Sequence, residues 1–173
     1  SGSGSGYNDD LSPIDRLKIA TQADGKLCYH KNTYSLYSIT LTKQRKIDAF
    51  LGLCNKAGIT PSRRKSYLIN GSVKHSWSYR MPAGTTKTLS KEFNIKIGYD
   101  RARQFIAEVV RWDGSVNRKT GQFYYSSSVK DNVDFVCAIA TQAGYSCNQT
   151  VQIDNRKETY KDIHRLFMAD TTT

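Results

Sequence analysis

The sequence has few acidic residues, few prolines and no long apolar segment. Asp and Glu number 15 against 26 Lys and Arg, which gives a formal net charge of +11 and a pI near 9.6. No apolar run approaches the roughly 18 residues that a membrane-spanning helix needs, and the basic residues are scattered through strand and loop segments rather than along one helix face. This balance indicates a polyanionic partner. Nucleic acid is favoured over an anionic membrane surface and over a merely basic soluble domain.

Cysteine is also scarce. The four cysteines have neither CxxC spacing nor a neighbouring His cluster, which argues against a zinc site; they are Cys28, Cys54, Cys137 and Cys147. Two of them fall in predicted helices, where a free Cys behaves as a small hydrophobe. Residues 1–6 have the Ser-Gly composition of a flexible linker and are left out of the fold argument, and no signal peptide is expected after them. The expected compartment is the reducing cytosol.

An internal repeat is the most informative feature that is present. Residues 17–25 read LKIATQADG and residues 105–114 read FIAEVVRWDG, so each apolar stretch ends at an Asp-Gly pair. A second pair of helix patterns matches at a constant separation of 86 residues, 42–48 with 128–134 and 57–59 with 143–145. The two Asp, at 24 and 113, are 89 residues apart, so the first copy has three extra residues in its hairpin loop. We interpret the chain as a single-chain pseudo-dimer.

Turn and capping signals predict the same order of elements in each copy. In the first copy we expect a helix over 13–23, strands over 27–31 and 34–41, a helix over 42–57 and strands over 65–69 and 72–80. A short helix over 86–93 follows. In the second copy we expect a helix over 100–112, strands over 115–118 and 122–126, a helix over 128–143 and strands over 147–154 and 158–168. Thr42 and Ser128 are the expected caps of the second helices, and Asn70-Gly71 is the strongest hairpin turn.

This order predicts an α+β fold of two pseudo-symmetric αββαββ repeats. Each repeat would form a four-stranded antiparallel sheet that is backed by helices on one face and open to water or a ligand on the other. The expected boundaries are a linker over 1–6, a first repeat over 7–84, an inter-repeat helix and linker over 85–99, and a second repeat over 100–173.

The predicted strands carry long hydrogen-bond donors, aromatic residues and amides, and few acidic residues. Arg and Lys can pair with phosphates or guanine edges, and Gln with adenine, if the sheet lies in a major groove. An ordinary solvated sheet face is the alternative, which the scarcity of acidic residues disfavours. The candidate DNA-binding residues are Tyr29, Lys31, Tyr37, Arg63, Arg64, Lys65, Lys74, His75, Ser76, Arg80, Arg118, Lys119, Gln122, Tyr124, Gln149, Gln152, Arg156, Lys157, Lys161 and Arg165.

An Asp-Gly pair after a helix is by itself a common stop signal. Paired copies change this interpretation, because equivalent helices of a pseudo-dimer tend to meet at the two-fold axis and bring their C-terminal ends together. We therefore expect the Asp24 and Asp113 carboxylates within about 10 Å of each other, near the pseudo-two-fold axis. A carboxylate is unfavourable at the negative end of a helix, and Mg²⁺, which prefers hard oxygen ligands, would relieve that repulsion.

These motifs resemble those of the LAGLIDADG homing endonucleases, especially the dodecapeptide type carried by inteins. The first motif keeps Ala-Asp-Gly at 23–25, with Gln22 at the first Asp of the family name. The second keeps Asp-Gly at 113–114 but has Glu108, Arg111 and Trp112 at the usual Gly, Asp and small residue. The segment WDGSVNRKTGQFYYSSS, over 112–128, also looks like the second half of intein-borne endonucleases. The resemblance covers about residues 13–168.

The resemblance implies a saddle-shaped endonuclease that acts as a monomeric pseudo-dimer on a long, asymmetric duplex DNA site. It implies cleavage of both strands across the minor groove with Mg²⁺, for which Mn²⁺ or Ca²⁺ can substitute in binding. Asp24 and Asp113 would be the catalytic metal ligands, one for each strand, and the carbonyls of Ala23 and Trp112 would be secondary ligands.

The resemblance also raises two points of detail. Basic residues near the scissile phosphates are expected, and the candidates are Lys74 and Lys161 in the last strand of each copy. The bulky Glu108 and Trp112 stand where small residues normally let the helices approach, which implies halves that sit further apart or are skewed.

Two functions therefore remain open, a sequence-specific endonuclease and a DNA- or RNA-binding module that no longer cleaves, such as a maturase or a degenerate intein insert. Retention of both Asp favours the enzyme. No splicing motif is evident, so an intein origin would make this the endonuclease domain alone. The expected location is the cytoplasm, at the nucleoid of a microbial or viral host cell.

Overall fold

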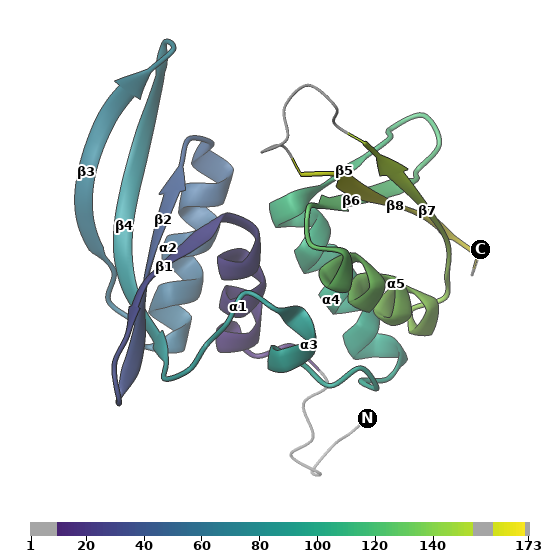
Figure 1. Ribbon diagram of the computed structural model, residues 1–173, viewed down its shortest axis with the longest axis horizontal. Helices are drawn as coiled ribbons and strands as arrows, with labels where there is room; N and C mark the ends of the chain where they lie inside the picture. The colour runs from purple at the N-terminus through teal and green to yellow at the C-terminus, as the bar shows by residue number, and fades with distance from the viewer. Residues whose placement is uncertain (1–9, 154–160, 172–173) are drawn as a thin grey trace. The chain divides into compact units, whose positions relative to one another are not determined.

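The computed structural model describes residues 10–153 and 161–171. Within this part the chain forms two compact units, one of residues 12–92 and one of residues 10–11 with 93–171. Each unit places helices on one face of a four-stranded antiparallel sheet (Figure 1). Across the described residues, none of the helices has the length and apolar character to cross a membrane.

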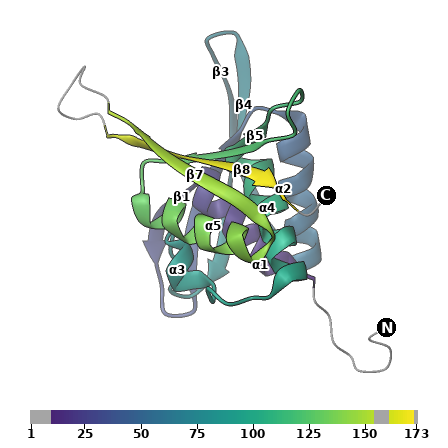
Figure 2. The same cartoon turned by 90° about the vertical axis from the view of Figure 1, so that its right-hand side faces the viewer.

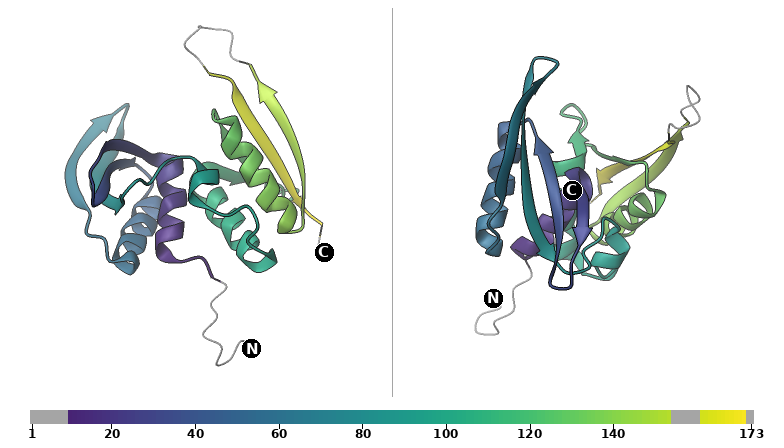
Figure 3. Two further views of the ribbon diagram at one scale, coloured as in Figure 1. Left: turned by 60° about the horizontal axis from the view of Figure 1, so that its bottom comes forward. Right: turned by 60° about the vertical axis from the view of Figure 1, so that its left-hand side comes forward.

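The first unit contains three helices and one sheet, whose strand order is β1-β2-β4-β3. Its elements are α1 (Pro13–Asp24), β1 (Gly25–His30), β2 (Tyr34–Leu41), α2 (Gln44–Ala57), β3 (Ser62–Ile69), β4 (Ser72–Pro82) and the short α3 (Leu89–Glu92). Helices α1 and α2 cover the same face of this sheet (Figure 3). The β3–β4 hairpin continues past the N-terminal end of α2, and Leu68 and Val73 near its tip are exposed (Figure 1).

Two sequence signals in the first unit act as expected. The Ser12 side chain caps α1 by accepting the N–H of Asp15 at 3.2 Å, and Pro13 occupies the first turn. Asn70 and Gly71 turn the β3–β4 hairpin with φ of 49° and 80°, the two left-handed conformations that a type I′ turn requires.

The second unit repeats the plan with the strand order β5-β6-β8-β7. Its elements are α4 (Tyr99–Asp113), β5 (Gly114–Val116), β6 (Phe123–Ser127), α5 (Lys130–Gln142), β7 (Tyr145–Gln152) and β8 (Ile163–Asp170). Helix α5 lies along β7 and β8 (Figure 2). The turn expected at 155–156 falls outside the described residues.

Strand registers show that the two sheets are equivalent position by position. One row of the first sheet runs Gly25, Ile39, Trp77 and Arg63, and the matching row of the second runs Gly114, Tyr125, Leu166 and Gln149. These residues are separated by the same 86 or 89 positions that the sequence motifs show. The predicted α+β fold of two αββαββ repeats is confirmed.

The second helix of each unit buries the same four positions against its sheet. They are Ile47, Phe50, Leu53 and Cys54 in α2, and Val133, Val136, Ile139 and Ala140 in α5. The Phe50 ring meets the Tyr79 ring edge-on at 5.0 Å, which adds to the burial of both rings.

The helix caps and some boundaries differ from the sequence prediction. Lys43 and Val129, not Thr42 and Ser128, precede α2 and α5, and neither makes a side-chain cap bond. Each helix begins two residues later than predicted, at Gln44 and Lys130. In the second unit, Ser127 Oγ accepts the Val129 N–H just before the helix. Both first hairpin strands begin at the Gly of Asp-Gly, and the short helix is only 89–92.

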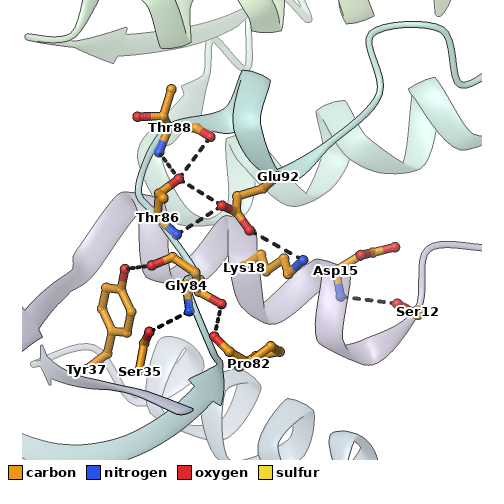
Figure 4. Close-up of polar contacts among 11 residues, drawn as sticks. Ser12, Asp15, Lys18, Ser35, Tyr37, Pro82, Gly84, Thr86, Thr88 and Glu92 are labelled. Atoms are coloured by element: carbon orange, nitrogen blue, oxygen red, sulfur yellow. Dashed lines mark hydrogen bonds and ion pairs between the residues drawn. The ribbon is translucent and has the colours of Figure 1, made fainter. Parts of the chain in front are cut away.

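The short helix α3 belongs with the first unit. Glu92 accepts hydrogen bonds from the N–H and hydroxyl of Thr86 and forms an ion pair with Lys18 of α1 at 3.4 Å (Figure 4). The Tyr37 hydroxyl of β2 donates to the Thr85 carbonyl at 2.5 Å. These contacts tie residues 84–92 to both α1 and β2.

Candidate functional site

Both Asp-Gly pairs lie where a helix passes directly into the first strand of its sheet. Asp24 is the last residue of α1 and Asp113 the last of α4, and the following Gly begins β1 or β5. Gly25 and Gly114 have φ of −81° and −130°, which other residues also adopt.

Close approach, rather than φ, explains the two glycines. A Cβ on Gly25 would lie 2.7 Å from the Thr21 carbonyl oxygen, and one on Gly114 would overlap the Tyr124 carbonyl oxygen. A side chain at this point would collide with the last turn of its own helix, and in the second unit also with β6, so only glycine allows the strand to pack directly against the helix end. This packing fixes the place of the preceding carboxylate in each unit.

In the first unit the carboxylate is paired. Lys46 Nζ, in the first turn of α2, lies 2.9 Å from Asp24 Oδ2, and the side chains are 16% and 24% exposed. Sequence reasoning missed Lys46. The β1–β2 hairpin could have indicated it. Because Gly25 pairs with Ile39, the chain just after Ile39, which leads into α2, lies beside Asp24.

The second unit has a different residue at the same position. The N–H groups of Lys46 and Ile47 both reach the Lys43 carbonyl, and the N–H groups of Asn132 and Val133 both reach the Val129 carbonyl. Asn132 therefore occupies the helix position that Lys46 has, and its side chain is buried and uncharged. The two repeats therefore differ in charge at this helix position.

The bulky departures in the second motif satisfy each other. Trp112 Nε1–H donates to Glu108 Oε2 at 2.7 Å, one turn apart on α4, and both side chains are buried. In α1 the buried polar partner is Thr21, whose hydroxyl lies 2.6 Å from the Tyr79 hydroxyl. Burial raises the pKa of Tyr79, so this phenol is neutral and serves as a hydrogen-bonding group of the core.

The residues at each helix end suit a cation that is shared with a ligand. In the described part of the chain, no three His, Cys, Asp or Glu side chains gather into a metal site. Mg²⁺ is usually held by one or two carboxylates together with substrate phosphates and water. Ala23 and Trp112 lie in the last helical turn, where carbonyls lack an intrahelical N–H partner. In each unit, one carboxylate and the neighbouring carbonyl of the last helical turn fit this donor set.

The strands that the structure describes carry almost no negative charge. Asp170 of β8 is their only acidic residue, and it pairs with Arg103 at 2.7 Å. On the first sheet, the face away from the helices presents Lys26, Lys65, Lys74 and Arg80. Residues that pair across neighbouring strands share a face, and the partners of these four, Ser38, Ser76, Tyr67 and Leu36, lie on that face. We call this surface the first open face.

Cations and aromatic rings are interleaved at one end of the first open face. The Arg80 guanidinium lies 4.2 Å from the centroid of the Tyr34 ring, and the Lys31 ammonium lies 5.3 Å from that of Tyr29. Lys26 and Tyr34 were not among the sequence candidates, although β2, which begins at Tyr34, alternates with buried residues.

The second open face, on the corresponding side of the other sheet, has a different character. Ser115, Tyr124, Phe167 and Asn148 form one row across all four strands. Ser126, Arg165 and Thr150 form the next row, and Ile163 and Gln152 the one after it. Arg165 donates to Gln152 Oε1 at 3.3 Å.

Four candidates were assigned to the wrong face. Tyr37 is 1% exposed and belongs to the core. Arg63 and His75 lie on the helix side of the first sheet, where Arg63 Nη2 and His75 Nδ1 are 2.9 Å apart. Gln149 is level with buried Leu166 and hydrogen-bonds Asp134 of α5. Strand alternation, shifted in β3 by a bulge between 63 and 65, accounts for these errors.

The remaining candidates are exposed or half-buried, or they fall outside what can be described. Arg118 and Lys119 lie in the turn between β5 and β6, and Gln122 directly precedes β6. Lys161 is exposed just before β8, and Lys74 faces outward near the hairpin tip. It is Lys46 that the structure places against Asp24. Arg156, Lys157 and the Arg64 side chain lie outside the described residues.

A separate cavity of about 850 Å³ lies beside the first sheet, and its lining does not include Asp24. It is bordered by the start of β2, the end of β4 and the loop after α2, through residues such as Tyr34, Ile59, Arg80 and Met81. Asp24 therefore lies outside this cavity.

Solved structures with the same arrangement define the class of fold. The N-terminal LAGLIDADG domain of DUF199/WhiA superposes with a TM-score of 0.59 at 11% identity, covering 91% of this chain and 75% of that one. The I-DmoI structure in complex with DNA and Mn superposes with a TM-score of 0.53 at 12% identity, covering 94% and 91%. The chain thus has the LAGLIDADG homing endonuclease-like fold.

Sequence comparison adds one curated relative. The chain is 28% identical over 150 residues to the ribonucleoside-diphosphate reductase subunit beta of Aquifex aeolicus. The match covers 81% of this chain and 22% of the relative, so the chain spans about a fifth of the length of that protein. No family model matches the sequence.

Proposed function

We propose that this protein is a sequence-specific, divalent-metal-dependent endonuclease that cuts both strands of a long duplex DNA site. The observation that carries the proposal is the repeated carboxylate at one structural position, Asp24 and Asp113, each at a helix end whose glycine cannot bear a side chain. The open faces, with almost no acidic residue in the described strands, supply the surface for DNA. I-DmoI, which shares the fold, has been observed with DNA and with Mn or Ca.

In this proposal each carboxylate holds the cation at one scissile phosphate, with the carbonyl of Ala23 or Trp112 beside it. A divalent cation supplies Lewis acidity, which activates water and stabilises the leaving oxygen of an in-line displacement. The Lys46 ammonium holds the Asp24 carboxylate in place, and it can donate to a phosphate oxygen once DNA is bound. The open faces hold the duplex so that the phosphates meet the helix ends.

We further infer that the chain is of the dodecapeptide, intein-borne type and derives from a mobile element inserted in a host protein. The curated match supports this, because the similarity is confined to 22% of a reductase subunit. A segment of endonuclease fold inside a reductase polypeptide is what such an insertion produces. The reductase coding sequence without the matched segment is accordingly a candidate target.

Two substrates test the proposal. One is a plasmid library with a randomised insert of about 24 base pairs, a length chosen to exceed the two sheets at about 3.4 Å rise per pair; the other carries the junction of the reductase sequence. With Mg²⁺ the wild-type chain is expected to linearise a recurrent sequence, and EDTA is expected to stop it. The Asp24→Asn, Asp113→Asn double variant is the control. Specific binding of a recurrent sequence without metal-dependent cleavage would overturn the enzyme assignment.

A DNA-binding protein that does not cleave is the second candidate. It is supported by the higher TM-score to the DUF199/WhiA domain than to I-DmoI, 0.59 against 0.53. The buried Glu108–Trp112 pair, which replaces small residues of the motif, also favours it. The same assay separates the two candidates, since a protein that only binds DNA would bind the recurrent sequence without cutting it.

A further inference from the structure

The two open faces differ in chemistry at equivalent positions. In register terms, Thr150, Gln152 and Phe167 of the second sheet correspond to Lys65, Tyr67 and Ser78 of the first. Asn148 corresponds to Ser62. The first face therefore presents several cations among hydroxyls and tyrosine rings, whereas the second presents the amides of Asn148 and Gln152 beside the rings of Tyr124 and Phe167. Among its described strand residues, Arg165 is the second face's one basic side chain.

Cations and amides do different work on DNA. Lys residues neutralise phosphates with little regard to sequence. Asn and Gln amides donate to N7 and accept from N6 of adenine in the major groove, and apolar side chains contact the thymine methyl group. A face of amides and an aromatic ring thus selects A·T pairs, while a face of lysines supplies affinity.

We propose that the second open face reads two A·T pairs through Asn148 and Gln152, with Phe167 against a thymine methyl group. This inference rests on the proposed function, since it requires duplex DNA as the ligand. Asn148 and Gln152 are both exposed and lie on the same face, four residues apart on β7. At about 3.4 Å per residue they are roughly 14 Å apart, which matches about four base pairs.

The neighbouring contacts hold these readers in place. The Phe167 ring packs edge-on against Tyr124 with centroids 5.0 Å apart, and Asn117 donates to the Tyr124 hydroxyl at 3.2 Å. Arg165 can only donate, so its bond to Gln152 fixes the amide with Oε1 toward the guanidinium and Nε2 away from it. Gln152 is thus oriented before DNA arrives.

Selection from a randomised duplex library, with sequencing of the bound pool, tests this inference on the full chain. Wild type is expected to enrich A·T at two positions about four pairs apart in one half of its site. Asn148→Asp should convert one of them to C·G, because a carboxylate accepts from cytosine N4. Asn148→Ser, which copies Ser62 of the first sheet, should lose that preference by roughly tenfold or more.

Lys65→Ala, which removes a cation without adding an amide, is the matched control on the first face. It should lower the salt dependence by about one phosphate and leave the selected sequence unchanged. Binding without A·T enrichment in either half, or an Asn148→Asp variant that selects the same sequence as wild type, would overturn the inference alone. Failure to bind any duplex at low salt would overturn it together with the proposed function.

Discussion

Lys46 Nζ lies 2.9 Å from Asp24 Oδ2, so the candidate metal ligand of the first repeat has a protein cation beside it. The equivalent helix position in the second repeat is Asn132, which has no charge to offer. If each repeat serves one strand, the two strands are cut in chemically different surroundings. The ammonium must also share the carboxylate with any divalent cation, and both would be balanced by an incoming phosphate.

Replacing Lys46 is expected to impair one strand more than the other. In Lys46→Met, cleavage at the Asp24 end should slow by roughly ten- to a hundredfold, because a positioned donor to the phosphate is lost. Nicked plasmid should then accumulate before linear product appears, in a time course from supercoiled substrate. Lys43→Met, one turn earlier on the exposed helix end, removes the same charge away from Asp24 and is the control. Equal slowing of both strands would contradict separate sites.

The glycines of the two Asp-Gly pairs should not tolerate a methyl group. Gly25→Ala and Gly114→Ala are each expected to lower the free energy of unfolding by about 1–3 kcal/mol, since the added Cβ meets backbone that cannot move away. Gly52→Ala is the control, because nothing lies within 4 Å of its added Cβ in the middle of α2. It should stabilise the protein by about 0.5–1 kcal/mol. Urea denaturation midpoints would measure all three, and unchanged stability in Gly25→Ala would contradict the close approach.

The sequence was sufficient for the order of elements because the signals were local. Ser12 and Pro13 begin α1, Asn70-Gly71 turns a hairpin, and Gly58 ends α2 in a left-handed conformation with φ of 72°. The helix caps at 43 and 129 were missed because their side chains make no capping bond, so no residue type marks them.

The details of the site depended on contacts between distant segments. Lys46 reaches Asp24 from 22 residues away, through the register of the first hairpin. A bulge after Arg63 changes which β3 residues face outward, and no single residue type predicts that bulge. Tyr37 looked like a DNA-facing aromatic residue, yet alternation places it with Ile39 and Leu41 in the core.

Thiol reactivity should report the packing of α2. Burial raises the pKa of Cys54 to about 12, whereas Cys28 is exposed. A raised pKa keeps the thiol neutral below that pH, so at pH 8 only about one Cys54 in ten thousand is thiolate. Iodoacetamide should therefore label Cys28 first, and mass spectrometry should find Cys54 protected from pH 7 to 9. Labelling of all four cysteines in guanidinium is the control, and equal labelling of Cys54 in the folded protein would contradict its burial.

DNA binding should depend strongly on salt and cover a long site. Log affinity is expected to fall by roughly 0.9 per neutralised phosphate for each unit of log salt. Strands of about 8 residues span roughly 26 Å, or some 7 or 8 base pairs per sheet, which predicts a site on the order of 15 to 20 base pairs. Anisotropy titrations and nuclease footprinting would measure both quantities. A footprint of about 6 base pairs would contradict binding through two sheets.

The two aspartates should be separable from binding. Asp24→Asn and Asp113→Asn are each expected to abolish double-strand cleavage, because an amide holds a divalent cation far less well than a carboxylate. Binding should persist and even tighten slightly, since a negative charge is removed near phosphates. Plasmid cleavage with Mg²⁺ and anisotropy with the same target would measure the two effects side by side.

The pattern of residual cleavage then distinguishes the metal arrangements. If each single variant nicks one strand, each carboxylate serves its own site, and the strand that survives identifies which repeat acts where. If both variants lose all cleavage, the two carboxylates share a cation, which requires them to lie close together as the paired motifs predict. Asp48→Asn is the control, because it replaces a carboxylate on the exposed side of α2. This variant should cut as wild type does. Wild-type rates in Asp24→Asn or Asp113→Asn would place the chemistry elsewhere in the chain.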